Sequence, residues 1–206
     1  MEDVLDLYCL PYDEDYPVIC MDEKPYQLLD EVLAPIPMKP GQVKRIDYEY
    51  KREGTCSIFV FSQPLTGWTY ANARERRTAV DFAHEIKTLL TVHFPCALKV
   101  RLVSDNLNTH VPASLYKAFT PKEAREMLRR IEFHYTPKHG SWLNMAEISI
   151  SMLARQCINR RIPDMATLNN AISAWCANQN RFRNPVNWQF DTVDARIKLR
   201  KLYPFI

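Results

Sequence analysis

The sequence LVSDNLNTH, residues 102–110, places an aspartate directly after a run of apolar side chains. Residues 98–103 are apolar enough for a central strand, which would run into Ser104, Asp105 and Asn106. A carboxylate at the end of a buried strand loses much of its water, and a cation or a strong hydrogen bond offsets that cost. Asp105 is therefore a candidate metal ligand, although a lone aspartate at this place also suits a simple turn.

A second acid stands in a similar place. The apolar run 18–21, VICM, ends at the stretch DEKP, residues 22–25, which predicts a buried strand stopped by a charged turn and a proline. Asp22 would thus end the first strand as Asp105 ends the fourth. The two acids are 83 positions apart (105 − 22), so only the fold can bring them together. Because ligands of layered sheets bind beyond the carboxyl ends of the strands, we expect them to be neighbours.

The third candidate acid is Glu147. Residues 142–159 have the pattern of an amphipathic helix with Ser141 as its N-terminal cap, and Glu147 falls on its first turns. It is the only acid between Glu132 and Asp164. The spacing also allows a solvent-facing role, because the helix needs a polar face and Glu147 can share one with Asn144, Ser151, Arg155 and Asn159.

The remaining pattern predicts a mixed sheet covered by helices. Residues 55–62 and 68–71 form an expected antiparallel hairpin, and residues 35–41 an expected loop. Helices are predicted from Thr78 to about residue 93, over 121–130 after Thr120, and from Asp164 or Thr167 to about residue 180, with a short strand at 131–135. The order strand, hairpin, helix, strand, helix, strand, helix, helix indicates an α/β or α+β layer fold.

Length and composition fit one soluble domain. The chain has 206 residues, 47% hydrophobic and 25% charged, within the ~100–200 residues typical of a single core. Its apolar runs are far shorter than the ~20 residues of a membrane helix, and Met1, Glu2 and Asp3 form no basic leader, so we expect a cytoplasmic protein with no membrane partner. The six cysteines form no CxxC pair, which argues against a zinc module or a disulfide framework.

The charge is unevenly distributed. The net charge is +3, yet residues 1–33 hold ten acids against Lys24 alone, a local net of −9, so the remainder carries +12. Clustered basic residues indicate a polyanion such as nucleic acid, although any single cluster also suits a solvated face. The expected contacts with a DNA backbone are Lys51, Arg52, Arg74, Arg76 and Arg77.

Four segments carry a resemblance to a known family. Residues 20–24 (CMDEK), 102–110 (LVSDNLNTH) and 136–147 (TPKHGSWLNMAE) closely resemble the acid-bearing motifs of bacterial insertion-sequence transposases related to the mariner group of the DDE superfamily, and residues 48–55 (YEYKREGT) resemble another of their blocks. The resemblance covers nearly the whole chain in the right order. It implies a ribonuclease-H-like fold over one catalytic domain, residues 1–206, with a catalytic triad of Asp22, Asp105 and Glu147.

The three carboxylates suit hard cations. An oxygen-rich site without a histidine or thiolate cluster selects Mg²⁺ or Mn²⁺, and two such ions about 3.5–4 Å apart can hold a scissile phosphate between them. We expect all three acids to be metal ligands, with Asp105 bridging both ions. Side chains that could orient these ligands or contact phosphate, or simply form turns, are Asn106, Asn108, His110, Lys138 and His139. Trp142 and Trp175 are expected to pack in the core, and only Trp142 is near enough to the site for stacking.

The resemblance further implies DNA strand cleavage followed by strand transfer, with double-stranded transposon ends and target DNA as partners, a homodimer, and action at the bacterial nucleoid. Two departures qualify it. The interval of 42 residues between Asp105 and Glu147 is longer than is typical of the mariner group and suggests an insertion around 113–130. Because only about 17 residues precede the first predicted strand, we expect this sequence to lack the helix-turn-helix recognition domains that such transposases usually carry ahead of the catalytic core.

Two alternative functions stay open at this point. Another ribonuclease-H-like nuclease would use the same metals with a fourth acid, for which Glu23, Asp81 and Asp164 are available. A remnant or domesticated DNA-binding protein would retain the scaffold without catalysis. Metal-dependent nicking of DNA separates the second alternative from the transposase hypothesis.

Overall fold

Five strands form one mixed sheet. The structure, a computed structural model, describes residues 1–138 and 140–203. The strands are β1 (Val18–Glu31), β2 (Tyr50–Gln63), β3 (Trp68–Arg74), β4 (Val100–Ser104) and β5 (Ile131–Tyr135). Their order in the sheet is β3-β2-β1-β4-β5, in which β1 is antiparallel to β2 and parallel to β4. The predicted hairpin is confirmed by the antiparallel pairing of β2 with β3, and β5 has the predicted bounds.

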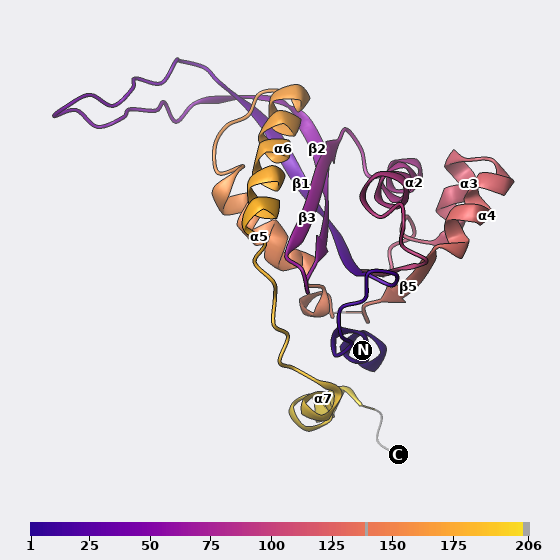
Figure 1. The fold of residues 1–206 in the computed structure, drawn as a ribbon. Coiled ribbons are helices and arrows are strands. Elements are labelled where there is room, and N and C mark those ends of the chain that lie inside the picture. Colours follow the sequence, from indigo (N-terminus) through magenta and orange to yellow (C-terminus); the bar gives the residue numbers. More distant parts are fainter. Residues whose placement is uncertain (139, 204–206) are drawn as a thin grey trace.

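Helices cover both faces of this sheet (Figure 1). One face carries α2 (Ala79–Thr88), which continues into a π-helical turn (Leu89–His93), together with α3 (Leu115–Ala118) and α4 (Pro121–Arg129). The other face carries α5 (Ala146–Gln156) and α6 (Met165–Phe182). Two short helices, α1 (Glu2–Tyr8) and α7 (Thr192–Lys198), lie beside each other at the end of the sheet near the N-terminus. The predicted mixed sheet flanked by helices is therefore confirmed.

Alternating side chains of the central strands build a core on each face. On β2, Phe59 and Phe61 point toward α2 and pack with Phe82, whereas Ile58 and Val60 point toward α5 and α6. All five of these side chains are fully buried. A third cluster, which contains Val103 and Ala146 among others, joins α1 and α7 to the sheet. The sheet is thus fixed from both sides, which gives the residues at its edge a rigid support.

The predicted helix starts agree with the observed caps. The Thr78 and Thr120 side chains each accept a bond from the backbone three residues later, and the acids Asp81 and Glu123 return the bond in capping boxes. Asp164 caps α6 through the backbone N–H of Thr167. These caps can be recognised in the sequence because each capping side chain accepts a hydrogen bond from a backbone N–H that the helix end leaves without a partner.

The first strand is longer than predicted, and Asp22 does not end it. β1 continues through Pro25 to Glu31, paired throughout with β2. Pro25 is tolerated because β4 pairs only with residues up to Cys20, so the other edge of β1 needs no N–H donor there. What ends near Asp22 is therefore the parallel pairing and not the strand.

The helix that carries Glu147 starts later than predicted. Residues Ser141–Leu143 form a short 3-10 turn, and α5 begins only at Ala146, so Ser141 is not its cap. The break lies at Asn144, whose backbone is extended (φ −84°, ψ 105°). As a result Trp142 is 45% exposed and does not pack in the core as expected, while Trp175 is buried as predicted.

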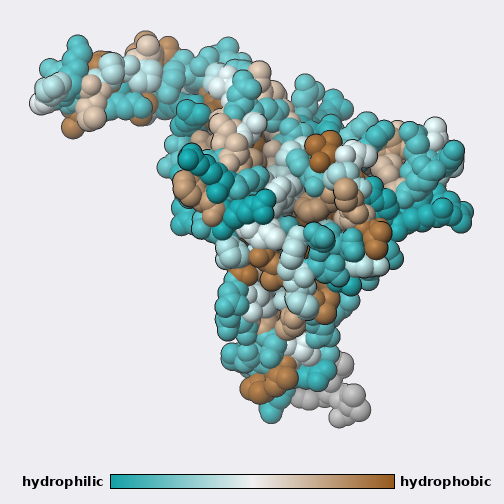
Figure 2. All heavy atoms as spheres, in the orientation of Figure 1, coloured by the Kyte–Doolittle hydropathy of each residue, from teal (hydrophilic) through white to brown (hydrophobic). Residues whose placement is uncertain are grey.

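A long arm, residues 32–49, leaves the body between β1 and β2 (Figure 1). It contains the predicted loop at 35–41 and is closed only by isolated bridges such as Ile36 with Arg45. Arg161, from the segment between α5 and α6, holds its base by donating to the carbonyl oxygens of Asp47 and Glu49, each at 2.8 Å. Apolar side chains lie exposed along the arm, as Figure 2 shows at its upper left.

Gly67, in the turn between β2 and β3, provides a test of this packing. It has φ +71°, and a Cβ atom there would lie 2.5 Å from the backbone nitrogen of Asn184. Gly41 at the tip of the arm has φ +77° with nothing within 4 Å, so it isolates the conformational cost. We expect Gly41→Ala to lower the free energy of unfolding by about 1 kcal/mol and Gly67→Ala by about 3 kcal/mol, because a backbone clash adds to the strain. Urea denaturation measures both, and equal losses would contradict the predicted clash.

Among the described residues, no helix combines the length and the apolar character that a membrane span requires.

Candidate active site

Asp22 lies on β1 just beyond the parallel pairing with β4. Its partner across β2 is Val60, which belongs to the core beneath α5, so the Asp22 side chain is on the α5 face of the sheet. The side chain is half-buried, and its Oδ1 accepts a 2.7 Å hydrogen bond from the backbone N–H of Glu23. The next residue, Glu23, is on the opposite face because side chains alternate along a strand.

Asp105 follows directly after β4. Since β1 and β4 are parallel and pair from Val18 to Cys20, the end of β4 and Asp22 meet at the same edge of the sheet, as expected. The Asp105 side chain is 35% exposed and lines an open hollow of about 1040 Å³, the active-site hollow. Its other lining residues are Asn106, Leu107, Thr136, Pro137, Lys138 and Ser141.

The start of α5, which carries Glu147, is held at this edge by Asn144. The sequence pattern had assigned this side chain only to a polar helix face. The Asn144 amide donates a 2.8 Å hydrogen bond to the backbone carbonyl of Met21, the residue before Asp22. Its Oδ1 accepts from the backbone N–H of Ala146 at 3.2 Å, and its backbone carbonyl accepts from the Glu147 N–H at 3.1 Å. Asn144 is 2% exposed, so these bonds fix the first turn of α5 against β1.

The negative charges of both other acids act on Asp22. The pKa of Asp22 is raised to about 6: burial is the largest cause, the charges of Glu147 and Asp105 add to it, and the Glu23 N–H bond and His110 partly offset it. A nearby cation would stabilise the ionised form of such a carboxyl. The fold thus brings together three acids from three segments that lie far apart along the chain.

The donor set fits divalent metal, although it is not preassembled. Among residues 1–138 and 140–203, no group of three histidine, cysteine or acidic side chains already stands at ligand distances. Asp22, Asp105 and Glu147 are the residues that would hold Mg²⁺ or Mn²⁺, because all their donors are hard oxygens.

His110 closes the other side of Asp105. Its Nδ1 lies 2.5 Å from Asp105 Oδ1, and its Nε2 lies 3.0 Å from Glu23 Oε1. Burial alone would lower the pKa of His110, but the hydrogen bonds and charges of Asp105 and Glu23 outweigh it and raise that pKa to about 9. Tyr135 on β5 donates to the His110 carbonyl at 3.0 Å, which holds the loop after β4 in place.

Comparison with protein families finds one family that matches most of the chain. Residues 17–169 match the family described as DDE superfamily endonuclease, and the match includes all three acids. The chain belongs to the DDE superfamily of endonucleases.

Solved structures show a similar fold. The crystal structure of the Mos1 mariner paired end complex with Mn is 14% identical, with a TM-score of 0.55 over 86% of this chain and 54% of that chain. The Mos1 strand transfer complex is 14% identical, with a TM-score of 0.49 over 80% of this chain and 50% of that one. This chain thus spans about half the length of the Mos1 chain in the paired end complex and has a ribonuclease-H-like fold. A comparison with curated proteins found no match.

The residues predicted to support the three acids are distributed unevenly. Asn106 and Lys138 line the active-site hollow with Asp105, and Asn108 lines an adjoining hollow beside Arg77. Both asparagines and Lys138 are exposed, so their roles stay predictions. His139, also expected here, lies outside the described residues.

The predicted DNA-backbone residues do not form one surface. Arg52 pairs with Leu29 on β1, seven residues past Asp22, which places Lys51 and Arg52 about 23 Å along the strand from the site. Arg74 binds the fully buried Glu85 at 2.5 Å, so its charge is already engaged. Arg76 and Arg77 are exposed, and only Arg77 lies beside the site residues, with its guanidinium 4.0 Å from Glu23 Oε2.

The three acids considered for a fourth ligand are engaged elsewhere. Glu23 binds His110 on the opposite face from Asp22, Asp81 belongs to the cap of α2, and Asp164 caps α6. The hypothesis of a four-acid nuclease loses its structural support because none of these carboxylates adjoins the triad in a ligating position.

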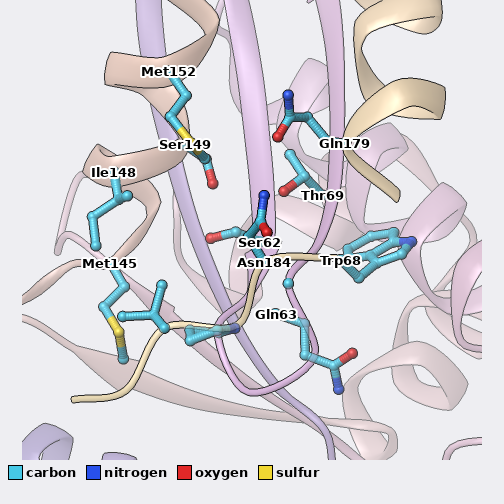
Figure 3. Close-up of a pocket in the computed structure, with 13 residues that line it drawn as sticks. Ser62, Gln63, Trp68, Thr69, Met145, Ile148, Ser149, Met152, Gln179 and Asn184 are labelled. Atoms are coloured by element: carbon cyan, nitrogen blue, oxygen red, sulfur yellow. The ribbon is translucent and has the colours of Figure 1, made fainter. Parts of the chain in front are cut away.

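A second hollow of about 370 Å³ lies under α5 (Figure 3). Ile148 and Met152 line it from α5, Met145 lines it from the position just before that helix, and Ser62 and Thr69 line it from the β2–β3 hairpin. All thirteen of its lining residues are uncharged, so it offers none of the carboxylate ligands that a divalent cation prefers. The carboxylates that could hold a divalent cation therefore lie at the acid-bearing edge and not in this hollow.

Proposed function

We propose that the chain is the catalytic domain of a DDE transposase, which cleaves DNA and transfers the freed strand with the help of two Mg²⁺ or Mn²⁺ ions. The observation that carries this proposal is the meeting of Asp22, Asp105 and the first turn of α5, which carries Glu147, at one edge of the sheet, in a chain of the DDE endonuclease family. When bound, the ions supply Lewis-acid activation of the attacking oxygen and stabilise the leaving oxygen.

The reaction needs no side-chain nucleophile. In cleavage, water attacks the phosphorus, the bond to the 3′ oxygen breaks, and the strand is left with a free 3′-hydroxyl. In strand transfer, that hydroxyl loses its proton to solvent and attacks a phosphorus of target DNA, from which another 3′ oxygen is expelled. The chain's own task is to hold three carboxylates in one orientation and to align phosphate beside them.

Double-stranded DNA is the proposed partner. The structural neighbours are a paired end complex and a strand transfer complex of Mos1, which supports DNA ends and target DNA as substrates. Of the basic residues considered, Arg77 and Lys138 lie near the triad, and we propose that they contact DNA phosphates. Arg74 already forms an ion pair with Glu85. A homodimer is part of the proposal, and the apolar side chains exposed on the arm, including Met38, Val43 and Tyr48, suit a contact with a second copy.

Nicking of supercoiled plasmid by the purified chain tests the proposal. We expect Mg²⁺- or Mn²⁺-dependent nicking that EDTA abolishes and that Glu147→Gln reduces by about a hundredfold or more, since metal assistance contributes several kcal/mol to such reactions. The matched control is Glu126→Gln, which removes an exposed helix acid from the other face of the sheet and should nick like the wild type. DNA binding without nicking by any sample would instead establish the non-catalytic DNA-binding alternative.

A further inference from the structure

A chain of three side chains runs from the interior of the α2 face to the triad. Glu23 Oε1 contacts His110 Nε2 at 3.0 Å, and His110 Nδ1 contacts Asp105 Oδ1 at 2.5 Å. The side chains of Glu23 and His110 are 3% and 0% exposed, whereas that of Asp105 is 35% exposed. The chain thus begins at a buried anchor and ends at a solvent-accessible candidate ligand.

The imidazole of His110 cannot turn freely. Both of its ring nitrogens face carboxylate oxygens, and its ring lies against Phe82 with centroids 5.0 Å apart. The backbone on either side is tied as well, because Tyr135 donates to the His110 carbonyl and Ser114 donates to the Thr109 carbonyl. A donor held this firmly fixes the direction of the acceptor that it binds.

We propose that His110, anchored by Glu23, is the positioning residue of the site: it holds Oδ1 of Asp105 and so sets the orientation in which this carboxylate meets metal. The inference rests on the proposed function, because it assigns His110 a role toward the metal ligand Asp105. It goes beyond the triad because it gives Glu23, a buried carboxylate on the opposite face of the sheet, a role in supporting a metal ligand without being one itself.

The same fold contains a matched control. His134 on β5 is also nearly buried and also lies between two carboxylates, with Nδ1 2.9 Å from Asp3 and Nε2 3.5 Å from Glu132. Neither of those acids belongs to the triad. A substitution of His134 therefore reports the cost of losing a buried histidine between two acids without touching Asp105.

Two amide substitutions separate positioning from stability. The Asn side chain places its Nδ2 near the former Nδ1, so His110→Asn keeps a donor for Asp105 and removes the hydrogen bond to the buried Glu23, which retains only the exposed Arg77 at 4.0 Å. The Gln side chain places its Nε2 near the former Nε2, so His110→Gln keeps a donor for Glu23 and removes the hydrogen bond to Asp105. Because the carboxylate that loses its hydrogen bond is buried only in His110→Asn, this variant should be the less stable of the two.

Mn²⁺ affinity and urea stability are measured on the full chain, by electron paramagnetic resonance of free Mn²⁺ and by denaturation, with nicking in parallel. We expect His110→Asn to bind Mn²⁺ within about threefold of the wild type, and His110→Gln and His110→Ala to bind about tenfold more weakly or worse, as for other residues that orient a ligand. His134→Asn should lose stability without losing Mn²⁺ affinity. The expected order of affinity is thus the reverse of the order of stability.

Affinity that follows stability, with His110→Gln tight and His110→Asn weak, would overturn the positioning role, as would wild-type affinity in all three His110 variants. The proposed function has its own readout in the same titration. A wild type that binds no Mn²⁺ would remove both the proposed function and this inference, whereas a wild type that binds Mn²⁺ and loses it on Asp105→Asn keeps the function and leaves the His110 variants to decide the inference.

Discussion

Asp105→Asn should lower metal-dependent DNA cleavage by about a thousandfold or more, because several kcal/mol of metal assistance are lost with the ligand and each 1.4 kcal/mol corresponds to about a factor of ten. The amide keeps the shape of the side chain and can still contact His110, but it lacks the charge that a divalent cation requires. Plasmid nicking and Mn²⁺ binding, measured on the same preparation, provide the test.

Stability should hardly change in the same variant. One of the two negative charges that raise the pKa of Asp22 disappears, which favours the folded state, while the hydrogen bond to His110 loses its charge-assisted character. These effects oppose each other, so we expect the free energy of unfolding to stay within about 1 kcal/mol of the wild type. Asp105→Asn protein that is folded and still cleaves DNA normally would refute the assignment of the triad.

Asn144→Ala should lower the free energy of unfolding by about 2–4 kcal/mol, because a buried carbonyl of Met21 loses its donor and the start of α5 loses an acceptor. Cleavage should fall as well, since Glu147 stands three residues further along the same turn. Urea denaturation measures the first effect, and nicking at a temperature where the variant is fully folded measures the second.

Asn144→Asp sharpens this test. A carboxylate offers no donor to the Met21 carbonyl and adds a fourth negative charge beside Asp22, so this variant should be less stable than Asn144→Ala when the carboxylate is ionised. Ser151→Ala is the control, because Ser151 is exposed on the same helix. If both Asn144 variants were as stable as Ser151→Ala, the proposal that the Asn144 hydrogen bonds hold α5 against β1 would be wrong.

Local patterns predicted most of the elements. Helix caps at Thr78, Thr120 and Asp164 were visible because capping depends on residues within one turn, and the strand 131–135 was visible as the short segment IEFHY directly after the predicted helix at 121–130. The short helices α1 and α7 were missed, since their stability comes from packing against each other and against the sheet, which a local pattern does not record.

The three acids of the candidate site were predicted, as was His110 as a residue that could orient them, but the contact of His110 with Glu23 and the bond from Asn144 were not. Asp22 and Asp105 were expected at strand ends, and the parallel register between β1 and β4 brings them to one edge even though β1 continues past Asp22. The contact between His110 and Glu23 joins residues 87 positions apart, and the bond from Asn144 to Met21 joins residues 123 apart. Sequence spacing holds no information on such pairs, because only the assembled sheet brings them into contact.

The placement of Asp22 and Glu23 on opposite faces of one strand has an evolutionary consequence. Inserting or deleting one residue between Val18 and Asp22 would exchange the two acids, turning the metal ligand toward α2 and the anchor of His110 toward α5. The arm, residues 32–49, lies beyond the irregular pairing at Leu28 and Leu29, so changes in its length leave that register intact. Lineages of this protein should therefore vary in length freely within the arm, while the few residues leading to Asp22 keep an invariant count.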